Sequence, residues 1–331
     1  MKKAFLNTLA LSVLLASGAQ AADLNPAVVF DMGGKFDRSF NQSVYDGMER
    51  FKGESGTNYR EFEVTNASQR EQAIRRFAQR GANPIISVGF AQAAAVDVVA
   101  GENPDVNITL IDMVVDKPNV QSIVYKEHEG SFLVGALAAM ASKTNTVSFV
   151  GGMDIPLIRK FACGYEQGVK YQSPNATVFQ NMTGSTGAAF NDPTKGSELA
   201  KSQFSKGSDV VFAAAGGTGI GVYQAAKDEG KLAIGVDSNQ NHIQPGTMLT
   251  SMVKRVDEAA FKTYSDSAAG TWKPGLVVLG LAEDGVDWAL DDNNAKLITA
   301  DMKAKINDIR SKIISGDIKV HDYMSDNTCN Y

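Results

Sequence analysis

Apolar residues fall along the chain in short runs of strand length, separated by stretches in which apolar positions recur at helical spacing. The strand-like runs are residues 28–31, 61–64, 84–88, 108–113, 121–125, 147–150, 177–180, 209–215, 232–236, 248–251 and 276–281. The helical stretches include residues 69–79, 91–100, 194–204 and 298–314. Apolar strands that alternate with helices are typical of parallel sheets with crossover helices. The pattern predicts an α/β protein with two similar halves.

Three of the predicted strands end in an aspartate, namely Asp31, Asp112 and Asp237, and Phe90 follows the end of another. Because ligands of open α/β sheets bind beyond the carboxyl ends of the strands, we expect these side chains at one cleft. The plain structural alternatives are a turn or helix cap for Asp112 and a hydrophobic lid over the sheet for Phe90.

The stretch from Asp31 to Gly47 is predicted as a strand end, a Gly-containing loop and a helix start. Ser39 is the expected cap of that helix. Phe40 and Asn41 then lie in the first turn, where they offer an aromatic face and a bidentate amide. A tight turn with Phe40 in the core is the structural alternative.

A second Gly-rich turn, containing Gly216 and Gly217, follows a buried-strand run. Such a turn can cradle a phosphate, but it lacks the Gly-Lys-(Ser/Thr) sequence of a P-loop. Further on, Lys254 is expected near the start of a helix at residues 253–257. It is either a solvated helix residue or, near Asp237 and Asp31, a hydrogen-bond donor to a ligand.

Residues 1–21 have the form of a secretory signal, with Lys2 and Lys3 before an apolar segment and a small-x-small site at residues 19–21. No cysteine follows that site, so we expect a soluble periplasmic protein rather than a lipoprotein. Cleavage would leave about 310 residues, enough for two domains.

Composition narrows the classes of partner and chemistry. The net charge of −5 argues against nucleic acid or anionic lipid as partner. Three histidines without a Cys/His cluster make a zinc site unexpected, and we expect no cofactor. Cys163 and Cys329 either pair in the oxidising periplasm or remain isolated thiols. His128 comes with no nucleophile in a recognisable motif, so we expect a structural role for it and no catalytic residues.

Four motifs resemble the basic membrane protein family of substrate-binding proteins. They are Asp-x-Gly-Gly with Asp-(Lys/Arg)-Ser-Phe-Asn-Gln at 31–42, Gly-Gly-Met-x-x-Pro at 151–156, Ala-Gly-Gly-Thr-Gly at 215–219, and Thr-Ser-apolar-apolar-Lys at 250–254. The resemblance implies a two-lobed type I periplasmic binding protein, each lobe a doubly wound, mostly parallel sheet, with hinge crossovers. The expected division is residues 22–126 plus about 253–285 for one lobe, and 127–252 plus about 286–331 for the other.

The candidate binding residues together suggest a nucleoside. Carboxylates accept hydrogen bonds from ribose hydroxyls, an aromatic face stacks on a base, and an amide reads a base edge. The resemblance implies the same ligand class, with the backbone of Gly216 and Gly217 near the ligand, and delivery to an inner-membrane ABC permease by a monomer. Other small ligands (a free base, a flavin or a sugar), a membrane sensor as partner, and a nucleoside hydrolase stay open as alternatives.

Overall fold

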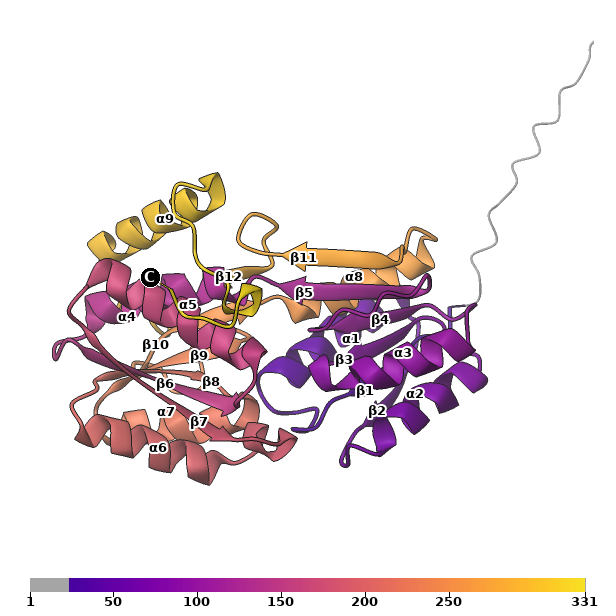
Figure 1. Cartoon of the computed structure of the whole chain (residues 1–331), viewed down its shortest axis with the longest axis horizontal. Coiled ribbons are helices and arrows are strands. Elements are labelled where there is room, and N and C mark those ends of the chain that lie inside the picture. The colour runs from indigo at the N-terminus through magenta and orange to yellow at the C-terminus, as the bar shows by residue number, and fades with distance from the viewer. Residues whose placement is uncertain (1–23, 331) are drawn as a thin grey trace, which may run out of the picture.

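The computed structural model describes residues 24–330, which form two lobes side by side, each built on a six-stranded sheet (Figure 1). The predicted signal at residues 1–21 lies outside the described residues. The two mostly parallel sheets with interleaved helices confirm the predicted α/β fold class.

In the N-terminal lobe every neighbouring pair of strands is parallel. The sheet order is β11 (Gly275–Leu279), β5 (Val120–Tyr125), β4 (Ile108–Ile111), β3 (Ile85–Val88), β1 (Ala27–Phe30) and β2 (Arg60–Glu63). The helices of this lobe are α1 (Phe40–Ser55), α2 (Gln69–Gln79), α3 (Ala93–Glu102) and α8 (Val256–Ala268).

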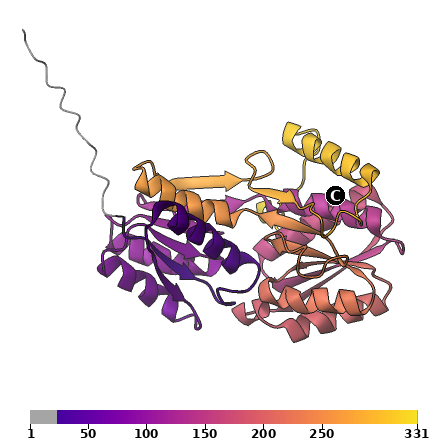
Figure 2. The same ribbon diagram turned by 180° about the vertical axis from the view of Figure 1, so that it is seen from behind.

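Strand β1 shows why these strands read as unbroken apolar runs. Val28 and Phe30 pack in the cluster that contains α1 residues, whereas Ala27 and Val29 pack with residues of α2 and α3. Both faces of the sheet are therefore covered, with α2 and α3 on the side seen in Figure 1 and α1 and α8 on the side seen in Figure 2. A sheet buried on both faces needs no polar alternation.

The C-terminal lobe repeats this plan, with one antiparallel edge strand. Its sheet order is β12 (Val286–Trp288), β10 (Met248–Lys254), β9 (Leu232–Asp237), β8 (Val210–Ala214), β6 (Thr146–Met153) and β7 (Thr177–Gly184). Its helices are α4 (Glu127–Ala141), α5 (Pro156–Gln172), α6 (Pro193–Ser205), α7 (Gly219–Asp228) and α9 (Ala300–Ser315). Short 3₁₀ turns at Phe90–Gln92, Gly187–Phe190, Gly216–Thr218 and Tyr323–Ser325 complete the description.

Helices α4 and α5 pack at backbone distance because glycines lie at their contacts. A Cβ on Gly164 would approach the His128 carbonyl oxygen to 2.5 Å, and one on Gly168 would approach the Phe132 carbonyl oxygen to 2.0 Å. Real Cβ atoms do not come so close, so side chains at these positions would force the helices apart. Helices α4 and α5 therefore form a closely packed pair on the side of the C-terminal lobe that faces the crossovers.

The chain passes between the lobes at the junctions β5–α4, β10–α8 and β11–β12. The predicted helix start at residues 253–257 is wrong in one respect, because Lys254 is the last residue of β10 and α8 begins at Val256. The strand continues to Lys254, where Val253 and Lys254 pair with β12, a pairing that the sequence did not reveal.

The C-terminal tail returns to α5. Cys163 and Cys329 form a disulfide, so the paired alternative is the one the structure has. On α9, Arg310 is part-buried against Asp287 of β12, at 3.1 Å. Within residues 24–330 no helix combines the length and apolar character needed to cross a bilayer.

Candidate ligand-binding site

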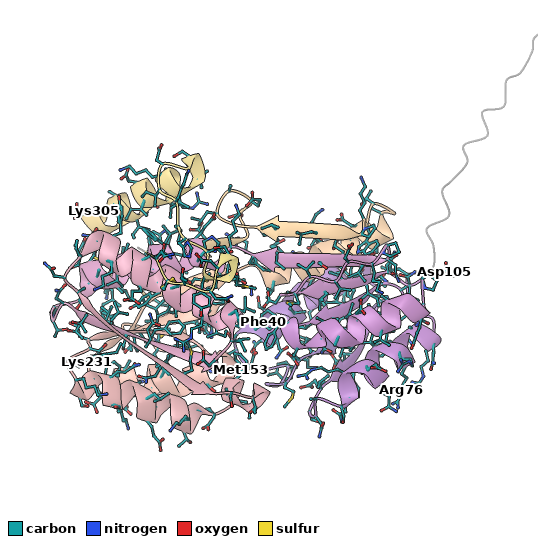
Figure 3. The ribbon with its side chains drawn as sticks, in the orientation of Figure 1. Phe40, Arg76, Asp105, Met153, Lys231 and Lys305 are labelled. Carbon is teal, nitrogen blue, oxygen red and sulfur yellow. A yellow bond between two sulfur atoms is a disulfide. The ribbon has the colours of Figure 1, made fainter. Side chains whose placement is uncertain are left out.

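A cavity lies between the two lobes and encloses about 610 Å³ of space, counting the part that is open to solvent. Strand ends of both lobes line it, as expected for parallel sheets that face one another. Figure 3 labels Phe40 and Met153 at the meeting of the lobes. The lining residues are Asp31, Met32, Asp37, Phe40, Asn41, Gly89, Phe90, Asp112, Leu157, Ile158, Phe161, Phe190, Ala214, Ala215, Gly216, Val236, Asp237 and Lys254.

The residues named from the sequence gather here with one exception, Gly217. Gly216, with a left-handed φ of 55°, lines the cavity, whereas Gly217 lies outside the lining, near the carbonyl oxygen of Phe190. The backbone of the turn therefore faces the cavity at Ala214, Ala215 and Gly216.

The loop that leads into α1 is organised by Asp37, a residue that sequence reasoning missed. Its carboxylate accepts hydrogen bonds from the backbone N–H groups of Ser39, Asn41 and Gln42, at 2.8, 3.0 and 3.1 Å. Ser39 occupies the N-cap position of α1, as predicted, but its side chain makes no capping hydrogen bond, and the carboxylate of Asp37 supplies those bonds. Burial raises the pKa of Asp37 from 3.8 to about 6 despite these bonds.

Ser39 instead reaches across the cleft. Its hydroxyl donates to Oδ2 of Asp237 at 2.5 Å. Next to it, the carbonyl oxygen of Arg38 accepts from Ser238 Oγ at 3.2 Å and from Gln240 Nε2 at 2.7 Å. We call this set of five residues the latch, since its hydrogen bonds join the two lobes.

Two residues of the latch have left-handed backbones, Arg38 with φ 59° and Asp237 with φ 64°; Asp112 at the floor of the cleft has φ 75°. Non-glycine residues in this region cost free energy and cluster at functional sites. At each of these positions the unusual backbone lies at the cleft, where side chains of one lobe meet the other.

At the mouth of the cleft, Asp31 is paired with Arg70 of α2, 3.0 Å from Arg70 Nη2 to Asp31 Oδ1. The pattern of strand ends does not reveal Arg70, because this residue lies in the first turn of α2. Burial raises the pKa of Asp31, against the opposing effect of Arg70. The amide of Asn41 is held to the backbone of Asp31, with its Oδ1 accepting from the N–H at 3.3 Å.

At the floor, Lys254 is buried and reaches Asp112 Oδ1 at 2.6 Å and Glu127 Oε1 at 3.0 Å. The alternative of a solvated helix residue is therefore wrong. Burial by itself lowers the pKa of Lys254, but Asp112, Glu127 and Asp237 together outweigh it and raise the pKa. The ammonium also lies 5.2 Å from the ring centroid of Phe40 and 5.6 Å from that of Phe161, within cation–π range.

The remaining acids of the floor are tuned by burial. The pKa of Asp112 is raised to about 6 by burial, against the effect of Lys254. Burial also raises the pKa of Asp237 to about 6, with Lys254 and the Ser39 hydroxyl opposing.

The C-terminal lobe supplies an apolar wall that the sequence did not reveal: Leu157, Ile158, Phe161 and Phe190. The ring of Phe190 packs against Gly152, where a Cβ would clash with the ring, so only glycine fits there. Together with Phe40 and Phe90 of the first lobe, these side chains give the cavity aromatic walls from both sides.

His128 lies on α4, away from the cavity, and burial lowers its pKa to about 4. None of the lining residues is Ser, Cys or His. Among residues 24–330 no cluster of His, Cys, Asp and Glu is arranged to hold a metal ion.

Comparisons with known proteins match the chain over most of its length. Residues 25–323 match the Bmp family, described as ABC transporter substrate-binding protein PnrA-like. The chain is 32% identical to the CD4+ T-cell-stimulating antigen of Listeria monocytogenes, over 94% of this chain and 97% of that protein. It is 33% identical to the ABC transporter nucleoside-binding protein BmpA of Lactococcus lactis, over 90% of each. A crystal structure of solute-binding proteins of an ABC transporter system from Aeropyrum pernix superposes with a TM-score of 0.83, at 27% identity over 89% of this chain and 92% of that one.

Proposed function

Because the chain belongs to the Bmp family of PnrA-like ABC transporter substrate-binding proteins, we propose that it captures a purine nucleoside in the cleft and delivers it to an ABC importer. The observation that carries this proposal is the composition of the cavity. It combines acids at the strand ends of both lobes with an aromatic and apolar wall, and it holds a single buried ammonium. This set suits a ligand with hydroxyls at one end and a flat ring at the other.

The acids have acceptor capacity to spare. Arg70 and the N–H of Met32 both use Oδ1 of Asp31, which leaves Oδ2 without a hydrogen bond within residues 24–330. Ser39 uses Oδ2 of Asp237, which likewise leaves Oδ1. We assign these two oxygens to ribose hydroxyls, one from each lobe.

The ring site is assigned to Phe40, with Phe190 and Phe90 as the other aromatic walls. Stacking on an aromatic side chain is worth about 1–3 kcal/mol per base. Asn41 is engaged by the backbone of Asp31, so its contact with a base edge would use the lone pair and N–H that those bonds leave.

The compartment and partner follow the same proposal. The chain is exported by its signal, cleaved after Ala21 without lipid attachment, and acts as a periplasmic monomer that docks on an inner-membrane ABC permease. Intact-mass analysis of a periplasmic extract tests this: a species that begins at Ala22 and carries no acyl chain is expected.

Titration calorimetry with guanosine, guanine and ribose tests the ligand class. Guanosine should bind at micromolar Kd or better, about −8 kcal/mol. Free guanine and ribose should bind much more weakly, because each leaves part of the polar site unpaired. A thermal-shift response to a sugar or a flavin but to no nucleoside would contradict the choice of ligand. Release of hypoxanthine from inosine would instead indicate a hydrolase.

A further inference from the structure

Lys254 does not stand alone behind the cavity. Glu127, the first residue of α4, is buried and does not line the cavity. Its Oε1 lies 3.0 Å from Nζ of Lys254, and its Oε2 lies 3.0 Å from Nζ of Lys160. Burial acting alone would raise the pKa of Glu127, but the two lysines outweigh it and lower the pKa, so a charged carboxylate joins them.

Lys160 of α5 lies at the first crossover between the lobes. It is 6% exposed, and its Nζ donates to the carbonyl oxygen of Tyr125, the last residue of β5, at 2.7 Å. Its other carboxylate neighbour is Asp322 of the C-terminal tail, at 3.5 Å. Lys160 therefore connects the crossover to a segment that is almost 200 residues further along the chain.

The tail is fastened to one face of α5. Lys160, Cys163 and Gln167 have the i, i+3, i+7 spacing that places side chains on one helical face. Cys163 holds Cys329 through the disulfide. Gln167 donates to the carbonyl oxygen of His321 at 2.9 Å and accepts from its N–H at 2.8 Å. These attachments on either side of Asp322 fix its carboxylate beside Lys160.

The result is an alternating row of charges, Asp112, Lys254, Glu127, Lys160 and Asp322, which we call the charge row. It runs from the cavity floor to the tail. If Asp322 were removed, Glu127 would be the carboxylate left beside Lys160 within residues 24–330. Lys160 would then attract Glu127 more strongly. The contact between Glu127 and Lys254 would weaken as a consequence.

We propose that the C-terminal tail is part of the binding apparatus: Asp322, held in place by the Cys163–Cys329 disulfide, positions Lys254 for the ligand through Lys160 and Glu127. Asp322 is a positioning residue, since it does not reach the cavity. The inference rests on the proposed function for its ligand, but the placement of Lys254 is measurable without one.

The test combines affinity with a direct probe of Lys254. Asp322→Asn and Cys329→Ser are each expected to weaken guanosine binding about threefold to tenfold. Both should also move the Lys254 side-chain signal in lysine-labelled NMR spectra of the ligand-free protein. Asp322→Glu should restore both readouts. Asp326→Asn is the matched control, because Asp326 orders the same tail through Thr328 and His321 but does not contact Lys160.

The results of these measurements distinguish a positioning role of Asp322 from a general ordering of the tail. Unchanged affinity and an unchanged Lys254 signal in Asp322→Asn would overturn the inference. So would an Asp326→Asn variant that behaves like Asp322→Asn, since order in the tail rather than its charge would then be responsible. If the wild-type protein binds no nucleoside, the proposed function fails, and the Lys254 signal alone decides whether the tail positions this lysine.

Discussion

Two cation–carboxylate pairs each include a carboxylate that lines the cavity, and they differ in how they are built. Asp31 and Arg70 both belong to the N-terminal lobe, and their side chains are 13% and 16% exposed. Asp112 belongs to the N-terminal lobe but Lys254 ends a strand of the C-terminal lobe, and these side chains are 7% and 1% exposed. The first pair lies within one lobe, whereas the second joins the two lobes.

This difference separates two tasks. Because Arg70 and Asp31 belong to the same lobe, Arg70 orients Asp31 whether or not the lobes close on a ligand. Because Lys254 and Asp112 come from different lobes, near the crossovers, the charge at the floor of the cavity depends on how the two lobes are joined. Removing one member of a deeply buried pair leaves the other as an uncompensated charge. In a part-exposed pair, water takes the place of the removed partner.

The sharpest test of the comparison removes each cation in turn. Lys254→Met should lower the free energy of unfolding by about 3–5 kcal/mol at pH 7, because Asp112 and Glu127 would lose the cation between them. Arg70→Met should cost about 1 kcal/mol or less, since solvent reaches that pair. Urea denaturation of the purified variants measures both. Equal losses would show that the two pairs are energetically alike.

Asp37 extends the comparison to a buried acid whose carboxylate accepts hydrogen bonds from backbone N–H groups. Its pKa is raised, so its contribution to stability is fully present below about pH 4 and is lost as pH rises through about 6. Asp37→Asn should remove this loss. Relative to wild type, the variant should gain up to about 3 kcal/mol between pH 4 and pH 7, since one pKa unit is about 1.4 kcal/mol. Denaturation across this range measures the difference, and parallel curves would contradict it.

Substitution of Phe40 tests whether the aromatic wall of the cavity contributes to ligand binding. Phe40→Ala should weaken guanosine binding at least tenfold, about 1.4 kcal/mol, while the protein stays folded. Phe36→Ala in the same loop is the control, because Phe36 is 65% exposed and does not line the cavity. Calorimetry that finds equal affinity for wild type and Phe40→Ala would assign Phe40 to the core alone.

The smallest effect is expected at the latch. Ser39→Ala removes the hydroxyl that bridges to Asp237 across the cleft, a bond worth about 1 kcal/mol net. Closure should become less favourable, with a loss of guanosine affinity of about fivefold. Small-angle scattering should show a larger radius of gyration before ligand is added. Ser55→Ala at the far end of α1 should change neither quantity.

The sequence predicted the parts of the site that follow from local pattern. Asp31, Asp112 and Asp237 each end an apolar strand, and the geometry of a parallel sheet then brings them to one edge. Phe40 and Asn41 were placed by the helix start that follows Asp31. In these cases the chain neighbours of a residue decide where its side chain points.

What the sequence left open depends on elements that meet only in the fold. Arg70 reaches Asp31 from the first turn of α2, and Glu127 joins two lysines from the first residue of α4. Strand β12 has three residues and no apolar run, so its pairing with Lys254 left no periodic signal. The capping role of Asp37 did have a local signal in the sequence, because an acid a few residues before a helix start is a candidate cap.

The three junctions between the lobes also determine when each lobe can be completed. The first sheet gains its last strand, β11, only from residues 275–279, and α8 of the same lobe from residues 256–268. A chain that ends before these residues leaves β5 as an open edge and the face under α8 uncovered. Contacts this distant in sequence slow folding. The chain therefore stays incompletely folded until nearly all of it is present, and the disulfide, which spans 166 residues, can close only at the end.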